Sequence, residues 1–129
     1  MIVSNLNDLE KTLPPLHHDM VSNLIFEHPG EAQYARVAIS ILGPGGGAEM
    51  HVHPGSEHYF LMLEGKLKVR TNKQEVIVGP GECVCVEDGE PHQVINAYDG
   101  ITRYFALGCP YPADWTPYEG EINIENEAE

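Results

Sequence analysis

Apolar and polar residues alternate through the middle of this chain with a period of two, which is the pattern of half-buried β-strands. In Tyr34–Leu42, for example, apolar side chains such as Val37 and Ile39 alternate with smaller or more polar ones. Further short runs of this kind predict strands at Val21–Glu27, Met50–His53, His58–Leu63, Leu67–Thr71, Glu75–Val78, Glu82–Val86, His92–Asn96 and Thr102–Leu107.

Clusters of glycine, proline and small polar residues separate these runs and predict tight turns. The longest cluster, Gly43–Gly47, is expected to end the strand before it, and His28–Glu31 is expected to be a turn. No segment shows a long helical period. Many short strands joined by turns indicate an all-β antiparallel sandwich or barrel.

The two ends of the chain differ from this middle part. The first fifteen residues predict a short helix that Pro14 and Pro15 end. Beyond Cys109 and Pro110 the sequence is rich in proline and then in glutamate. We therefore expect one domain over residues 1–129, with a barrel core at about 20–109 and an irregular acidic strap or tail at 110–129.

The amino-acid composition restricts the kinds of binding partner and the cellular compartment that we expect. The formal net charge is −13, from 20 acidic and 7 basic side chains, so nucleic acid and anionic membrane surfaces are not expected to bind. No export signal and no apolar run near the length of a membrane span is present. An odd number of cysteines, Cys83, Cys85 and Cys109, agrees with a reduced, cytoplasmic setting.

Histidines supply the candidate chemistry. His51 and His53 are two residues apart on an expected strand, so both side chains point to the same face and can reach one ion. Glu57 and His58 open the next strand, and His92 opens another. Imidazole and carboxylate groups gathered in this way indicate a metal site.

At these residues the chain resembles the cupin superfamily, whose two motifs it carries in the right order. The first motif, Gly-x5-His-x-His-x3–4-Glu-x6-Gly, is matched by Gly45, His51, His53, His58 and Gly65. The second, Gly-x5-Pro-x-Gly-x2-His-x3-Asn, is matched by Gly81, Glu87, Gly89, His92 and Asn96. The resemblance implies a double-stranded β-helix, also called a jelly-roll barrel, with a metal held by His51, His53, His92 and a fourth ligand.

The sequence departs from the family pattern at two positions. Glu87 replaces the proline of the second motif, and His58 stands at the spacing of the glutamate ligand in the first. Glu57 would fit only with a bulge in the strand, because neighbouring strand residues point to opposite faces. We favour His58 as the fourth ligand, as in four-histidine cupins, and keep Glu57 as the alternative.

The resemblance implies one divalent transition-metal ion per subunit. The imidazole and carboxylate donors are compatible with Fe, Mn, Ni, Cu, Co or Zn. A dioxygenase-type oxidoreductase acting on a small organic molecule, such as an organic acid, is the activity we expect. A non-oxidative isomerase, lyase or decarboxylase and a non-catalytic sensing protein are the alternatives. Tyr59 and Glu49 are candidate proton donors or acceptors.

Two further expectations concern recognition. Small cupins pair their barrels, so the resemblance implies a homodimer, with contacts at Tyr34–Leu42 and along Tyr59, Leu61 and Leu63. Arg36 and Arg103 are scarce positive charges on expected strands, and either could enter the barrel to bind a substrate carboxylate.

Overall fold

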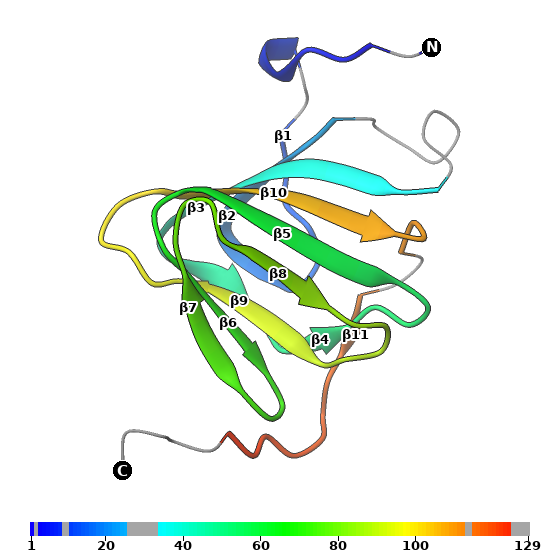
Figure 1. The fold of residues 1–129 in the computed structure, drawn as a ribbon, viewed down its shortest axis with the longest axis vertical. Coiled ribbons are helices and arrows are strands. Elements are labelled where there is room, and N and C mark those ends of the chain that lie inside the picture. Colours follow the sequence, from blue (N-terminus) through cyan, green and yellow to red (C-terminus); the bar gives the residue numbers. More distant parts are fainter. Residues whose placement is uncertain (2, 9–10, 26–33, 113–114, 125–129) are drawn as a thin grey trace.

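The fold is built almost entirely of β-strands, as the sequence predicts (Figure 1). The computed structural model describes residues 1, 3–8, 11–25, 34–112 and 115–124. The strands and the one helical turn among them are η1 (Leu6–Asp8), β1 (Lys11–Thr12), β2 (His17–Leu24), β3 (Arg36–Ala48), β4 (His51–Val52), β5 (Glu57–Glu64), β6 (Leu67–Thr71), β7 (Glu75–Val78), β8 (Cys83–Val86), β9 (His92–Asn96), β10 (Thr102–Cys109) and β11 (Thr116–Pro117).

Antiparallel pairing joins these strands into one curled sheet. Its order is β11-β4-β9-β3-β10-β5-β8, with β1 and β2 added beside β3 and with β6 and β7 added beside β9. In Figure 1, β10, β5 and β8 lie in the upper part of the barrel, and β9, β6 and β7 lie in the lower part. This arrangement confirms the expected cupin-type jelly roll.

Side chains alternate between the inside and the outside of the barrel along each central strand. On β5, His58, Phe60 and Met62 are buried, whereas Tyr59 and Leu61 are exposed. The inward apolar side chains form one core cluster that stabilises the barrel by removing apolar surface from water. Its members are Met20, Leu42, Ala48, Phe60, Met62, Leu67, Val69, Val78, Val86, Val94, Tyr104 and Ala106.

Strand β3 does not end at Gly43–Gly47, and that expectation was wrong. It continues to Ala48 and passes from its pairing with β10 to a pairing with β9. The glycines permit this because the backbones approach closely: a Cβ on Gly46 would lie 2.3 Å from the Asp19 carbonyl oxygen, and one on Gly47 2.6 Å from the Val94 carbonyl oxygen. The glycine run is therefore a bend within a strand.

The N-terminal segment contains less helix than the sequence predicts. Leu6–Asp8 forms a single 3-10 turn, and Lys11–Thr12 already pairs with β2. Strand β2 itself begins at His17, four residues before the expected Val21, and the end of that expected strand and the turn at His28–Glu31 lie outside the described residues. No helix in the described ranges is long and apolar enough to cross a membrane.

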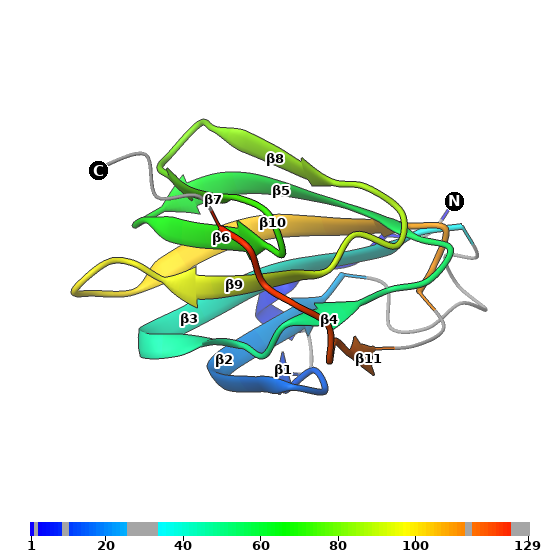
Figure 2. The ribbon, with the colours of Figure 1, turned by 90° about the horizontal axis from the view of Figure 1, so that it is seen from below.

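The described part of the C-terminal segment is bound to the barrel. Thr116 and Pro117 of β11 pair with Val52 and His51 of β4. Farther along, the backbone N–H of Asn123 donates to the Asn72 carbonyl at 2.7 Å. Figure 2 shows this segment, in red, crossing the strands of the lower part of the barrel. We refer to the described part of this segment, residues 115–124, as the strap.

Candidate metal centre

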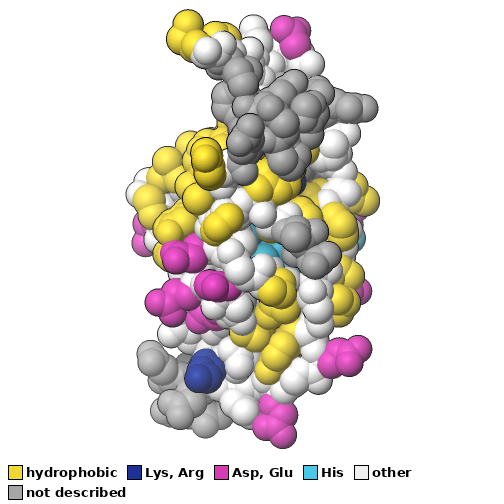
Figure 3. Space-filling view, turned by 90° about the vertical axis from the view of Figure 1, so that its right-hand side faces the viewer, with side chains coloured by type: hydrophobic (Ala, Val, Ile, Leu, Met, Phe, Trp, Pro, Cys, Tyr) yellow, Lys and Arg dark blue, Asp and Glu magenta, His cyan; other side chains and the backbone are white. Residues whose placement is uncertain are grey.

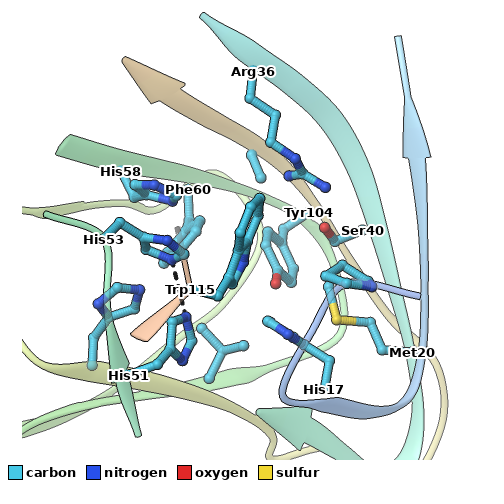
Figure 4. A pocket seen from close by; sticks show the side chains of 14 residues that line it. His17, Met20, Arg36, Ser40, His51, His53, His58, Phe60, Tyr104 and Trp115 are labelled. Carbon is cyan, nitrogen blue, oxygen red and sulfur yellow. Dashed lines mark hydrogen bonds between the residues drawn. The ribbon is translucent and has the colours of Figure 1, made fainter. Parts of the chain in front are cut away.

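Three buried histidines meet at one end of the barrel (Figure 4). His51 lies directly opposite His92 in the pairing of β4 with β9, and His53 follows two residues after His51. Their side chains are only 2–3% exposed, and one potential ligand atom from each lies within 4.8 Å of the others. The motif spacing and the strand pairing together bring these three residues to a single point.

Backbone carbonyls set the orientation of two of these rings. The Nδ1 atom of His51 lies 2.6 Å from the Glu49 carbonyl oxygen, and the Nδ1 of His92 lies 3.0 Å from that of Glu90. A carbonyl oxygen only accepts hydrogen bonds, so each Nδ1 carries the proton and each Nε2 keeps its lone pair. Both rings therefore present a donor lone pair to the pocket.

The residues present fit a bound cation. The Nε2 atoms of His51 and His53 lie 3.0 Å apart, a distance at which two ring nitrogens share a proton or a cation. Burial is the main cause that lowers the pKa of His51, and it lowers the pKa of His92 to about 3. Neutral imidazole is the form that coordinates metals, so burial keeps these side chains ready for an ion.

His58 lies in the same pocket but outside this group of three. Its ring stacks on that of His53, with centroids 4.0 Å apart and planes 8° apart. Its Nε2 is buried without a hydrogen-bond partner among the described residues, close to Gly108. Burial lowers the pKa of His58 to about 4. The three ligand atoms that lie within 4.8 Å of one another do not include one from His58.

Glu57 and Tyr59 point to the outside of the barrel. The Tyr59 hydroxyl donates to the Glu57 carboxylate at 2.6 Å, and this bond is the first cause that raises the pKa of Tyr59 to about 12. Strand β5 pairs with β8 in regular register from His58 onward, without the bulge that would turn Glu57 inward. Glu49 is also exposed, and only its carbonyl contacts the site. The structure thus brings neither Tyr59 nor Glu49 into the pocket.

The histidines form the floor of a small pocket with a cavity volume of about 30 Å³. Figure 3 shows histidine atoms at the bottom of a narrow opening on this face, between hydrophobic side chains. In addition to the four histidines already described, ten residues line the pocket: Pro14, His17, Met20, Arg36, Ser40, Phe60, Val94, Tyr104, Ala106 and Trp115.

His17 is a pocket residue that sequence reasoning left out. Its Nδ1 lies 2.7 Å from the Pro15 carbonyl oxygen, its ring centroid lies 5.4 Å from that of His51, and burial lowers its pKa to about 4. Met20 is buried, so strict alternation of inward and outward side chains along β2 would have turned His18 inward as well. A shift of register between His18 and Met20, with Asp19 at φ 47°, reverses the phase. No pattern in the sequence predicts this shift of register.

Trp115 and Arg36, which lie far apart in the sequence, also line the pocket. The Trp115 indole lies edge-on to His53, with centroids 5.2 Å apart, and the Arg36 guanidinium carbon lies 5.5 Å from the indole centroid. Arg103, the other arginine considered from the sequence, is on the surface 3.9 Å from Glu64. Arg36 is therefore the one that enters the barrel, whereas Trp115 arrives on the strap.

Comparisons with known sequences agree with this geometry. A family profile described as "Cupin domain" matches residues 38–108, which include His51, His53, His58 and His92. The tetracenomycin polyketide synthase protein TcmJ of Streptomyces glaucescens is 38% identical over 55 residues. That match covers 43% of this chain and 37% of TcmJ.

Comparisons with solved structures show the same fold. The polyketide cyclase RemF of Streptomyces resistomycificus superposes with a TM-score of 0.78 at 20% identity, over 95% of this chain and 89% of RemF. A predicted oxalate decarboxylase of Thermotoga maritima superposes with a TM-score of 0.73 at 17% identity, over 84% of this chain and 99% of that protein.

Proposed function

This chain belongs to the cupin superfamily, and from that premise we propose that it is a metal-dependent enzyme that promotes enolate chemistry on a small carbonyl substrate. The observation that carries the proposal is the convergence of His51, His53 and His92 on one buried point. A barrel of this size is stabilised by its own apolar core, so it does not need a metal ion for folding. An ion held at the histidines would therefore be available for catalysis.

The donor set favours a transition metal over Mg²⁺ or Ca²⁺. His51, His53 and His92 would hold the ion, and His58 would join them as the fourth ligand. Neutral imidazoles suit Fe, Co, Ni, Cu or Zn, and they leave the full charge of the ion uncompensated. A bound divalent ion would supply positive charge that stabilises the oxygen of an enolate.

The similarities favour a reaction without an oxidant. TcmJ is named as a polyketide synthase protein and RemF as a polyketide cyclase. Cyclisation of a polyketide joins the carbon of an enolate to a carbonyl carbon, and no electrons leave the substrate. We therefore place redox-neutral chemistry on a β-dicarbonyl group ahead of the dioxygenase activity that the sequence suggested.

We assign the proton transfer to His17. Its Nδ1 donates to the Pro15 carbonyl, so its Nε2 keeps the lone pair that takes a proton from the carbon between two carbonyl groups. The same proton then returns to the oxygen of the new alcohol. Tyr104, whose pKa burial raises to about 12, stays protonated at neutral pH and offers a hydrogen-bond donor in the same pocket.

An exchange assay tests this function. Zinc-loaded protein is mixed with benzoylacetone in D₂O, and hydrogen exchange at the central carbon is followed by NMR while an oxygen electrode records O₂. We expect metal-dependent acceleration without O₂ uptake, reduced about 100-fold in His17→Gln. His18→Gln is the matched control, because His18 is the exposed neighbour. No acceleration, or equal rates in the two variants, would refute the assignment.

The same experiment separates the alternatives. Four protein ligands on an octahedral ion would leave two positions for substrate and O₂, so O₂ uptake matched to turnover by the iron-loaded protein would establish the dioxygenase. Tight binding of the diketone without exchange or O₂ uptake would instead identify a binding protein.

We also propose a homodimer, formed through the outer face of the sheet. Strand register places outward side chains of four strands in one row: Ile39 of β3, Phe105 of β10, Leu61 of β5 and Cys83 of β8. Leu61 in this row is 39% exposed, and Leu63, two residues along β5, is 45% exposed. A continuous apolar sheet face is the kind of surface that subunit contacts bury. Two of these strands, β3 and β5, carry the residues at which the sequence predicted the contact.

A further inference from the structure

Arg36 is a half-buried cation that forms no ion pair with a carboxylate among the described residues. The chain has three arginines; Arg70 lies 3.0 Å from Glu75 and Arg103 lies 3.9 Å from Glu64. Arg36 instead donates to the Ser22 hydroxyl at 3.3 Å, and burial is the main cause that lowers the pKa of its guanidinium. In a chain with 20 acidic residues, this lack of an ion pair calls for an explanation.

Trp115 lies between this cation and the histidine cluster. Its indole contacts the Arg36 guanidinium on one side, at 5.5 Å, and His53 on the other, at 5.2 Å (Figure 4). The space that joins the two charged ends of the pocket is thus filled by a planar aromatic ring. A ligand that reached both ends would occupy this same space and would need a similar shape.

The remaining space is too small for a substrate beside the indole. A cavity of about 30 Å³ holds about two water molecules, whereas pockets for organic ligands are typically about 300–1,000 Å³. A ligand that spanned the pocket from Arg36 to the histidines would therefore have to take the place of the Trp115 indole. After Trp115, the strap is attached to the barrel by the two-residue pairing of β11 with β4 and by the Tyr118 N–H, which donates to the Met50 carbonyl at 3.0 Å.

We propose that the pocket binds a planar conjugated anion that takes the place of the Trp115 indole, with its anionic oxygen on the Arg36 guanidinium and its other end at the histidines. The guanidinium would gain the charge-assisted hydrogen bonds that it lacks, and its contact with a flat ring would be kept. This inference names the substrate class of the proposed function and rests on it for the role of the histidine end.

Calorimetric titration tests the charge requirement. The probe is 6-hydroxy-2-naphthoate, and its neutral match is 6-hydroxy-2-naphthamide, each added to metal-free and to zinc-loaded protein. We expect the acid to bind about 10- to 100-fold more tightly than the amide in both forms. Arg36→Met should abolish this preference and Arg36→Lys should keep part of it. Arg103→Met, the surface control, should leave it unchanged.

A second variant tests the displacement of the indole. Trp115→Ala should bind the naphthoate at least as tightly as the wild type, because no side chain has to leave. Weaker binding by Trp115→Ala would mean that the indole is a wall of the site and would overturn the displacement. Thermal melting checks that each variant folds; Arg36→Met should melt near the wild-type temperature, since it removes a half-buried charge and keeps the chain length.

The outcomes separate this inference from the proposed function. Equal affinity for acid and amide, or a preference that survives Arg36→Met, would overturn the inference even if zinc binds and exchange is accelerated. A preference for the acid that depends on Arg36 in protein that binds no zinc would instead support the inference and refute the proposed function.

Discussion

The Nε2 atoms of His51 and His53 lie 3.0 Å apart at the closed end of the pocket, and a ligand atom of His92 lies within 4.8 Å of each ring's donor. Imidazole nitrogens this close together are stabilised by a cation that accepts their lone pairs.

The buried histidines should make the metal-free protein sensitive to acid. Burial lowers the pKa of His17 and His58 to about 4 and that of His92 to about 3, whereas the unfolded chain protonates them near 6.5. As the pH falls below about 6.5, the unfolded state takes up protons first, so the free energy of unfolding decreases until about pH 3–4. Each histidine contributes up to about 1.4 kcal/mol per pH unit.

Urea denaturation of the metal-free protein at pH 7.5 and pH 5 measures this effect. His17→Gln should reduce the difference between the two pH values, and His18→Gln should not. A stability that stays constant or rises on acidification would show that the histidines are not held neutral in the folded protein.

The fourth ligand is expected to be His58 rather than Glu57. His58→Ala should weaken zinc binding about 10- to 100-fold, because it removes a donor already inside the pocket. Glu57→Ala should have no effect, since its carboxylate accepts from Tyr59 on the outer face. Zinc content after dialysis against a graded chelator measures both, and loss of zinc in Glu57→Ala alone would reverse the assignment.

Asn96, the last residue of β9, is predicted to stabilise the barrel through its side-chain hydrogen bonds. Its amide N–H groups donate to the carbonyls of Leu42, Gly43 and Gly100, and its Oδ1 accepts from the Thr102 hydroxyl at 2.7 Å. Asn96→Ala leaves these buried groups without partners and should cost about 2–4 kcal/mol in urea denaturation. The exposed Asn123→Ala is the comparison and should change stability by less than about 0.5 kcal/mol.

Charge on the outer apolar face should prevent dimerisation. Leu61→Lys places an ammonium group in the row formed with Phe105 and Cys83, so the variant should sediment as a monomer where the wild type sediments as a dimer. Ile77→Lys alters a residue that is 57% exposed on β7 and should remain dimeric. A monomeric wild type, or a dimeric Leu61→Lys, would refute the proposed interface.

Much of the fold follows from local patterns. The bounds of Leu67–Thr71, Glu75–Val78 and His92–Asn96 were predicted to the residue, because alternation and a turn at each end define them. The inward register of β5, which buries His58 and turns Glu57 to the outer face, follows from the same alternation. Nearby motif spacing likewise sufficed to place His51, His53 and His92 together.

The rest depends on contacts between distant segments. The bulge at Asp19 brings in His17 instead of His18, and it exists because β2 follows the bend that the glycines make in β3. Trp115 reaches the pocket only because β11 pairs with β4, which no local pattern indicates. Tyr59 and Glu49 are candidates from the sequence because their side chains can transfer protons. Both lie outside the pocket, because Tyr59 is on the outward face of β5 and Glu49 is exposed.

A titration of metal-free protein with Ni²⁺, followed by the fluorescence of Trp115, tests the central claim most directly. Trp115 is the only tryptophan of the chain, and its ring lies 5.2 Å from that of His53. We predict quenching that saturates at one ion per subunit, with affinity reduced at least about 10-fold in His51→Ala and in His92→Ala. Absence of quenching, or unchanged affinity in both variants, would contradict a metal centre at these histidines.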